Sequence, residues 1–388
     1  MPTTRLTNLI YRVRISIPWN IPQLQNNPPL SVRGTPLHSP QSYIRLLRRH
    51  HVLGSAALLS DGSHRTVILS SSDRPSHIVT EESYFRIASI TKMATALAAL
   101  TAVENGMLSL DAPVSTYLKP LSSCDGLNQI TLFHLLTHTS GLSDPVNMEK
   151  ALLQEVSVYS LLPGAVSSAP GSCFRYSNLG FGLIGCLLES VYQLSVEDIF
   201  QKLVFGPLEM NATLSASSLS REKIVPITRI YPWRKDADLY VTPLGMKPMT
   251  GPDPSLHYGY TAGAMYVDLP SLEKMVHCLM RNGEPLIQSD LGSMMKQRHA
   301  VYGPVSPSLS YGLGLLLIDD PGISTSRILG HQGFAYGCAD GAFWEEDTGR
   351  VVLFLNGGAS EARHGRLGLC NEQILRWALR KEMPKWPG

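Results

Sequence analysis

The sequence predicts an α/β protein of the α+β kind, in which both ends of the chain contribute strands to one antiparallel sheet flanked by helices. Strand-like apolar runs occur near residues 54–69 and return at 311–355, and helical patterns occupy the chain between them. No internal repeat interrupts this order. We therefore expect the sheet to be built from about 50–80 and 305–380, with a mostly helical subdomain inserted at about 85–300.

The first two strands are predicted to form a hairpin. Residues 54–60 and 64–69 are apolar runs joined by Asp61-Gly62, and Asp-Gly between such runs is typical of a tight β-turn. A short amphipathic helix near 42–50 precedes them. Late in the chain, we expect strands at 311–318, 339–344 and 351–355, followed by a last helix near 368–380.

The clearest helix covers residues 89–105. This segment is rich in Ala and Leu and contains neither Gly nor Pro, and Gly106 follows where a helix C-terminus favours glycine. Because residues 93–103 are nearly uncharged, the helix is expected to be buried. Further helices are expected at 129–138, 178–194, 195–204 and 270–282.

Residues 1–40 are expected to form an irregular basic extension outside a single catalytic domain at 41–388. They are rich in Pro, Asn, Gln and Ser, and residues 10–17 alternate like a strand that Pro18 ends. The first 60 residues contain seven arginines and no acid, whereas the remainder has 26 basic and 31 acidic residues. Such a segment is either an arginine-bearing surface extension or an organelle-targeting sequence.

Composition excludes several classes of protein. A chain of 388 residues with 44% hydrophobic and 16% charged residues is typical of an ordered globular protein. A net charge of +2 gives no reason to expect nucleic acid as a partner, and no apolar run reaches the roughly 18 residues of a membrane span. Six scattered cysteines without a Cys-x-x-Cys pair argue against a structural zinc site. We expect a cytoplasmic protein, and leave its oligomeric state open.

The segment Phe85-Arg-Ile-Ala-Ser-Ile-Thr-Lys92 carries the main candidates for chemistry. A serine hydroxyl is a poor nucleophile without an adjacent base, and a lysine three residues later on a helix lies on the same face, with Cβ atoms about 5–6 Å apart. A desolvated Lys92 has an accessible neutral amine that can remove the Ser89 proton. The backbone N–H of Ser89, at a helix start, points toward any developing oxyanion.

Ser-x-x-Lys is not specific by itself, because this chain contains it four times, with serines at positions 89, 220, 271 and 293. For any one of them taken alone, a solvated helix surface is the more common explanation. Ser89 differs because it alone begins a long, nearly uncharged helix. A lysine heading a buried helix is costly unless it has a function, so Ser89 and Lys92 are the preferred pair.

Tyr176-Ser-Asn178 is the second candidate, placed where a loop enters the predicted helix at 178–194. A tyrosine beside a lysine can act as a phenolate or a proton shuttle. Asn178 offers a donor and an acceptor to an acyl group or to the lysine. The alternative is a buried tyrosine followed by an asparagine that caps the helix.

Gly330-His-Gln-Gly333 is the third candidate. Glycine lets a strand edge approach a substrate closely, and the N–H of Phe334 would be a second oxyanion donor. A lone histidine such as His331 is more often a satisfied polar residue. His138, in His134-Leu-Leu-Thr-His-Thr-Ser-Gly141, is predicted to be structural and to hold a helix-to-loop turn.

Together these segments resemble one known family. Residues 85–92, 130–142, 176–178 and 330–333 follow one another in the order found in serine β-lactamase-like proteins. The resemblance is to the branch with class C β-lactamases, D-alanyl-D-alanine carboxypeptidases, esterases and fungal transesterases of the lovastatin-acyltransferase kind. It implies a β-lactamase/transpeptidase-like fold and a two-step acyl-enzyme reaction that needs no metal or organic cofactor.

The resemblance also implies roles for the matching residues. Ser89 would be the nucleophile, Lys92 its activating partner and Tyr176 the residue that shuttles protons. The backbone N–H groups of Ser89 and Phe334 would form the oxyanion hole. Substrate-binding roles would fall on Asn178, His331, Gly333 and Phe334.

The third motif departs from the β-lactamase pattern of Lys, then Thr or Ser, then Gly. Here His331 and Gln332 replace the charge and the hydroxyl that would hold a carboxylate. Trp233 lies where relatives build the rim of the acyl site, and is either a contact for a bulky apolar substrate or part of a packed surface loop.

We therefore predict an esterase or transesterase that acts on a small acylated molecule, as in specialised metabolism. A D-amino-acid peptidase or amidase, or a β-lactamase, is the first alternative. A non-catalytic relative that binds a ligand is the second, and it would be expected to lack Ser89, Lys92 or Tyr176, all of which are present.

Overall fold

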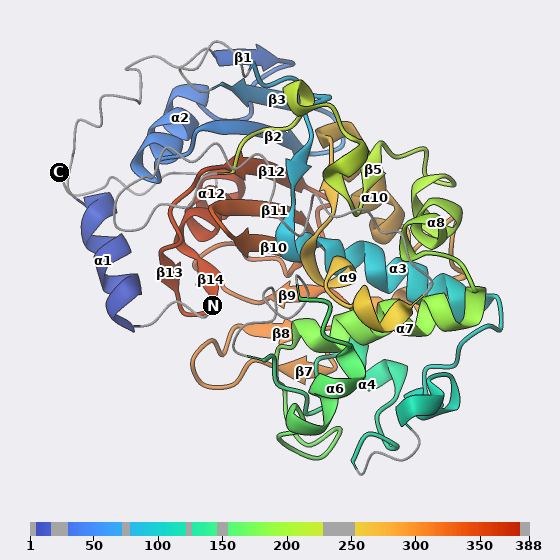
Figure 1. Ribbon diagram of the computed structural model, residues 1–388. Helices are drawn as coiled ribbons and strands as arrows, with labels where there is room; N and C mark the ends of the chain where they lie inside the picture. The colour runs from blue at the N-terminus through green and yellow to red at the C-terminus, as the bar shows by residue number, and fades with distance from the viewer. Residues whose placement is uncertain are drawn as a thin grey trace.

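The computed structural model describes residues 5–16, 30–71, 78–121, 126–145, 154–227 and 253–380. Its centre is a nine-stranded sheet in the order β1-β3-β2-β12-β11-β10-β9-β8-β7, in which every neighbouring pair with a printed register is antiparallel (Figure 1). The predicted fold is confirmed, because strands from the two ends of the chain meet where β2 pairs with β12. The helical part of the chain lies on one side of this sheet.

The strands of the large sheet are β1 (Leu30–Arg33), β2 (Gly54–Ser60), β3 (Arg65–Ser70), β7 (Ala300–Val301), β8 (Leu309–Tyr311), β9 (Leu316–Ile318), β10 (Ile328–Ala335), β11 (Cys338–Glu345) and β12 (Val351–Gly357). A three-stranded sheet has the order β4 (Phe85–Arg86), β6 (Tyr266–Val267), β5 (Ala212–Thr213), and a small hairpin pairs β13 (Arg363–His364) with β14 (Leu367–Gly368).

The helices are α1 (Arg5–Ser16), α2 (Pro40–Arg49), α3 (Thr91–Glu104), α4 (Leu132–Leu136), α6 (Val158–Leu161), α7 (Asn178–Tyr192), α8 (Val196–Phe200), α9 (Tyr260–Gly263), α10 (Leu269–Met280), α11 (Ser289–Met295) and α12 (Leu369–Leu379). A 3₁₀ turn at Ala88–Ile90 precedes α3, and a π-helical turn at Gln201–Phe205 follows α8.

Both faces of the central sheet are buried, and successive side chains of a strand enter different cores. In β2, Ala56 and Leu58 belong to the large core that includes α3, α7 and α10. The intervening Ala57 and Leu59 pack instead with α2 and α12. Because successive side chains of a strand point to opposite faces, a continuous apolar run is needed where helices cover both sides. The central sheet is therefore a layer between two sets of helices.

The helix α3 is the buried centre of the helical part. Its residues from Thr91 to Ala102 are all buried, which confirms the expectation from its uncharged sequence. It packs against α7 and α9. Among the described residues, no single helix is long and apolar enough to cross a membrane; α7 and the segment Val196–Phe205 pass that test only as a pair bent by 85°.

The expectation of an irregular segment at residues 1–40 is wrong in two places. Arg5–Ser16 form the helix α1, where the alternating pattern predicted a strand, and Leu30–Arg33 pair with β3. Tyr11 and Ile15, four residues apart on α1, pack against Ala362. Burial of one helix face on the main body of the protein outweighs the local alternation, which a single sequence does not reveal.

Residues 311–318 form two antiparallel strands rather than the single strand expected. The chain turns between β8 and β9, and Gly314 has a φ of +74°. Its N–H donates to Leu136 O at 3.0 Å, and a Cβ there would lie 2.4 Å from the Cβ of Ala96. Only glycine allows this close approach of the turn to α3.

Candidate functional site

A tight turn between β4 and α3 presents Ser89. Ala88 has a φ of +45°, a conformation uncommon for a residue with a Cβ, and its carbonyl accepts a 2.6 Å hydrogen bond from the Thr91 hydroxyl. Ser89 is partly exposed, although residues 85–88 and Ile90 around it are buried. The turn therefore holds one hydroxyl at the surface of an otherwise buried segment.

Lys92 is fully buried one helical turn away, with three hydrogen-bond acceptors around its amine. Its Nζ lies 3.1 Å from Ser89 Oγ, 2.8 Å from Asn178 Oδ1 and 2.5 Å from Ala262 O. The acceptors come from the 3₁₀ turn before α3, from α7 and from α9, so the structure brings the first two sequence motifs together. Two of the three acceptors, on α7 and α9, are far from the lysine in the sequence.

Burial lowers the pKa of Lys92 to about 7, while the charge of Asp144 acts to raise it and that of Arg86 acts to lower it. A neutral amine has two N–H donors and one lone pair. It can keep its bonds to Asn178 and Ala262 and direct the lone pair at the Ser89 hydroxyl. The surroundings of Lys92 thus suit a general base near neutral pH.

Tyr176 lies beside this pair, and its hydroxyl is hydrogen-bonded to Ser89. Lys92 Nζ is 5.0 Å from the centre of the Tyr176 ring. Burial raises the pKa of Tyr176 above its ordinary value, so the phenol keeps its proton at neutral pH. Of the two roles open from the sequence, this arrangement favours a proton shuttle over a standing phenolate.

Asp144 is a residue of the site that the sequence reasoning missed. One of its carboxylate oxygens accepts from Asn178 Nδ2 at 2.8 Å, and the other accepts from Ser177 Oγ at 3.0 Å and from Leu179 N at 2.9 Å. It therefore caps the start of α7 and orients the Asn178 amide so that Oδ1 faces Lys92. Asp144 is the single acid between Asp125 and Glu149, which is the only sequence signal that pointed to it.

His331 on β10 is buried and neutral. Its ring nitrogens are paired with Tyr311 OH at 2.9 Å and with Gln332 O at 2.7 Å. Burial, with a smaller contribution from the charge of Lys92, lowers the pKa of His331 to about 3. Its ring centre is 6.4 Å from that of Tyr176. His331 therefore belongs to the site without contributing a charge, and Tyr311 is a second member that the sequence reasoning missed.

Gly333 allows β10 to run against the turn that holds Ser89. A Cβ at this position would lie 2.3 Å from the carbonyl oxygen of Ile87, a contact that real side chains do not make. The next residue, Phe334, packs its ring against the Arg363 guanidinium. The central carbon of that guanidinium, Cζ, lies 4.4 Å from the centre of the Phe334 ring. The role of the Phe334 N–H in an oxyanion hole remains a prediction.

His138 holds the loop that carries Tyr176. It has a φ of +57°, its Nδ1 accepts from Ser177 N at 3.2 Å, and its carbonyl accepts from Arg175 N at 2.7 Å. Its ring centre lies 4.3 Å from that of Tyr176. Burial lowers the pKa of His138 well below its ordinary value, so the ring is neutral. These contacts agree with the structural role predicted from the sequence.

Two further points concern residues outside this cluster. Trp233 lies outside the described residues, so its predicted contact with substrate remains a prediction. Within the described ranges, no group of three or more His, Cys, Asp or Glu side chains is placed to hold a metal ion. The five described cysteines are free, and four of them are buried.

Comparison with known proteins assigns the chain to a family. The family model described as Beta-lactamase matches residues 41–367. Esterase EstB of Burkholderia gladioli is 34% identical over 150 residues, which cover 34% of this chain and 38% of the esterase. Penicillin-binding protein 4* of Bacillus subtilis (strain 168) is 27% identical over 265 residues, which cover 65% of this chain and 55% of the relative. The chain thus spans between a third and little more than half of these relatives.

Solved structures agree in fold. The chain is similar to EstCE1, a hydrolase with promiscuous acyltransferase activity, with a TM-score of 0.66, 20% identity and coverage of 96% of this chain and 100% of EstCE1. The beta-lactamase/D-alanine carboxypeptidase from Pseudomonas syringae gives a TM-score of 0.69 at 15% identity, with coverage of 89% and 98%. Because the family model extends over residues 41–367, the chain belongs to the beta-lactamase family of serine hydrolases.

Proposed function

We propose that this protein is an esterase or transesterase that forms an acyl-enzyme on Ser89 and acts on small acylated molecules, as in specialised metabolism. The observation that carries the proposal is the contact between Ser89 Oγ and the Nζ of a fully buried Lys92 whose pKa is about 7. A serine with a desolvated amine at 3.1 Å has the base it needs to become a nucleophile at neutral pH. The relative EstB is an esterase by name, which supports ester chemistry.

In the proposed reaction, Ser89 Oγ attacks the carbonyl carbon of the substrate while its proton moves to neutral Lys92. The C–O bond to the leaving alcohol then breaks, and the alcohol takes a proton from the Tyr176 hydroxyl, which Lys92 replenishes. Water or a second alcohol attacks the acyl-enzyme by the same route in reverse, and Ser89 regains its proton. The N–H groups of Ser89 and Phe334 would stabilise each tetrahedral oxyanion.

Esters are favoured over β-lactams because His331 carries no charge where the β-lactamase pattern has a lysine. Its pKa of about 3 and its two hydrogen bonds keep it neutral at physiological pH. A charged hydrogen bond is worth about 1.5–3 kcal/mol, so the loss of one that holds a carboxylate costs about 10- to 100-fold in binding.

We expect the purified protein to hydrolyse short p-nitrophenyl esters with a kcat/KM at least about 10-fold above that for a D-amino-acid amide or a chromogenic β-lactam. Spectrophotometric rates measure all three substrates. Addition of a primary alcohol, with the products identified by mass spectrometry, separates hydrolysis from acyl transfer. Preferential turnover of the amide or the β-lactam would replace this proposal with the amidase or β-lactamase alternative.

Asp144→Asn is expected to shift the pH profile in a defined direction. The negative charge of Asp144 raises the pKa of Lys92, so its removal lowers that pKa below about 7 and moves the acidic limb of kcat/KM to lower pH. The variant should also lose about 1–3 kcal/mol of unfolding free energy, because an amide N–H would face the Leu179 or Asn178 donors.

A pH series of kcat/KM and a urea titration measure these two effects. Asp290→Asn, an exposed change in the first turn of α11, is the matched control and should alter neither. An acidic limb that stays in place or moves to higher pH would contradict the assignment of this limb to Lys92.

A further inference from the structure

Arg86 is a buried arginine on β4, three residues before Ser89. One nitrogen of its guanidinium, Nη2, donates to Gly263 O at 2.7 Å, whereas Nη1 is buried without a hydrogen-bond partner. The central carbon, Cζ, lies 5.2 Å from the centre of the Tyr336 ring, and the Cys338 thiol lies beside the guanidinium. In the described part of the chain, no carboxylate lies within ion-pair distance of this cation.

The end of the short helix α9 joins Arg86 to the general base. Ala262 O accepts from Lys92 Nζ at 2.5 Å, and the next carbonyl along the chain, Gly263 O, accepts from Arg86. The last carbonyls of a helix have no partner within it, so donors from other elements determine how the helix end is held. Arg86 therefore fixes the carbonyl that follows the one bonded to the Lys92 amine.

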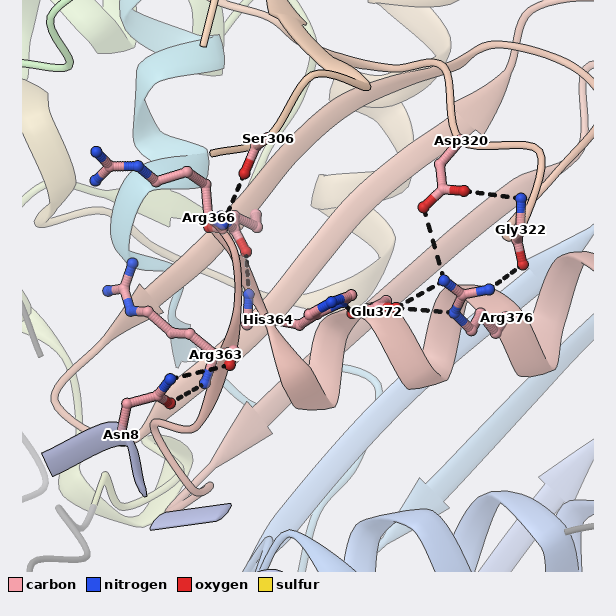
Figure 2. A network of polar contacts seen from close by, with 11 residues as sticks. Asn8, Ser306, Asp320, Gly322, Arg363, His364, Arg366, Glu372 and Arg376 are labelled. Carbon is pink, nitrogen blue, oxygen red and sulfur yellow. Dashed lines mark hydrogen bonds and ion pairs between the residues drawn. The ribbon is translucent and has the colours of Figure 1, made fainter. Parts of the chain in front are cut away.

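Arg376 on α12 shows the more usual surroundings of a partly buried arginine (Figure 2). Its guanidinium lies 2.7 Å from Glu372 Oε1 and 3.6 Å from Asp320 Oδ2. Arg86, in contrast, has a carbonyl dipole, a thiol and an aromatic ring around it. A buried cation without an ion-pair partner is unfavourable for stability, which points to a role for Arg86 in the site.

The positive charge of Arg86 acts on Lys92. Burial is the largest cause of the lowered pKa of Lys92; the charge of Arg86 lowers it further, and the charge of Asp144 opposes both. Two like charges in a buried region repel each other strongly, so a permanent cation at Arg86 favours a neutral amine on Lys92.

The other titratable groups around these two side chains are held toward their neutral forms. Burial lowers the pKa of His138 and His331, which face Lys92. Burial also raises the pKa of Tyr176 beside Lys92 and of three groups that face Arg86, namely Cys338, Asp340 and Tyr266. Arg86 and Asp144 are therefore the two charges that act on Lys92 in opposite directions.

Arg363 is a second arginine that acts on the site. Asn8 of α1 accepts from Arg363 N at 2.8 Å and donates to Arg363 O at 3.3 Å, which holds its backbone on the β13–β14 hairpin (Figure 2). Its charge acts to lower the pKa of Tyr176 against the larger effect of burial. The charge of Arg86 thus falls on the base, and that of Arg363 on the proposed proton shuttle.

We propose that Arg86 is a positioning residue for the Ser89–Lys92 pair, which fixes the end of α9 beside the Lys92 amine and opposes a second positive charge there. The inference rests on the proposed function, because it concerns the base of the same reaction. Arg86 acts through the α9 carbonyls and through its charge, and not through a bond to Ser89.

Arg86→Met is expected to move the acidic limb of kcat/KM for a p-nitrophenyl ester to higher pH, because loss of the cation lets the pKa of Lys92 rise above about 7. A rise of about one unit lowers kcat/KM at pH 6 by about 10-fold, and most of this loss should disappear at pH 9. If circular dichroism shows that Arg86→Met does not fold, Arg86→Gln is used, which also lacks the charge but can still donate to Gly263 O.

Two further variants make the outcome specific. Arg86→Met combined with Asp144→Asn should return the limb toward its wild-type position, because the two charges act on Lys92 in opposite directions. Arg376→Met should lower the unfolding free energy without moving the limb, because its charge is paired with Glu372 and Asp320 on the far side of α12 from the site. A limb that stays in place in Arg86→Met, with a loss of activity that is equal at every pH, would reduce Arg86 to a structural residue and overturn the inference while leaving the proposed function intact.

If the wild type turns over no ester, the proposed function fails, and stability then tests Arg86 separately. A buried Lys92 makes the unfolding free energy rise with pH between about 7 and its ordinary pKa of 10.5. Arg86→Met should make this rise smaller, because the pKa of Lys92 moves toward its ordinary value, and the effect should be largely lost in a Lys92→Met background. Urea titrations across this pH range measure the rise, and an equal rise with and without Arg86 would overturn the inference.

Discussion

Ser89→Ala is expected to reduce kcat for p-nitrophenyl esters by at least about 10⁴-fold and to abolish covalent labelling by a fluorophosphonate. The substitution removes the atom that forms the acyl bond, and no other described serine hydroxyl is hydrogen-bonded to a buried lysine amine. Because Ser89 is partly exposed and its Oγ only accepts from Lys92 and contacts Tyr176, the unfolding free energy should change by less than about 1 kcal/mol.

Mass spectrometry of the labelled protein locates the adduct on the peptide that contains Ser89. Ser293→Ala is the matched control, since Ser293 and Lys296 have the same spacing. There the serine hydroxyl donates to Asp290 O at 2.9 Å and the lysine donates to Met280 O at 2.7 Å. This control should label and turn over like the wild type. Labelling of Ser89→Ala at the wild-type rate would show that the nucleophile lies elsewhere.

Lys92→Met is expected to lower kcat by about 10²–10⁴-fold, because the variant keeps the volume of the side chain but loses the base. In the wild type, kcat/KM should rise with pH through about 7, as the Lys92 ammonium loses its proton. Methionine has no proton to lose, so the variant should lack this limb. The measurement is a pH profile of kcat/KM for both proteins on one ester.

Lys92 also predicts a pH dependence of stability. Its pKa is about 7 in the folded protein against an ordinary 10.5, so between these values the unfolded chain binds more protons than the folded one. Unfolding free energy should therefore rise with pH across this window, and Lys92→Met should remove that rise. Lys223→Met, which removes an exposed lysine, is the control for loss of a lysine. If kcat/KM of Lys92→Met still rose with pH through about 7, the proposed role of the Lys92 amine as the base would be contradicted.

The structure brings together those predicted site residues that are close along the chain or belong to a motif. Ser89 lies in the 3₁₀ turn that leads directly into α3, three residues before Lys92, so their contact follows from helical spacing. Asn178 was proposed from the second motif, and its contact with Lys92 depends on the packing of α7 against α3. Asp144 and Tyr311 were missed because their contacts with the site are made to segments distant in the sequence, and no spacing between those segments marks them.

The third motif shows the same limit. The sequence showed that His331 and Gln332 differ from the β-lactamase pattern, and from this we inferred a site without a fixed positive charge. In the structure, burial lowers the pKa of His331 to about 3, and Gln332 anchors the β13–β14 hairpin, which carries Arg363. A charge can reach a site from any element packed beside it, so the absence of a lysine from one strand does not determine the electrostatics of the whole site.

The amino-acid pattern alone was enough to predict the sheet made from both chain ends, the buried helix behind Ser89 and the spacing of Ser89 and Lys92. These follow from local periodicity, turn residues and helix geometry, all of which act over a few residues. The lowered pKa of Lys92, the Asp144 cap, the helix α1 and the position of Arg363 depend on contacts between segments up to 355 residues apart. Burial and charge at such contacts are set by the assembled fold, because desolvation depends on everything that surrounds a group rather than on its neighbours in sequence.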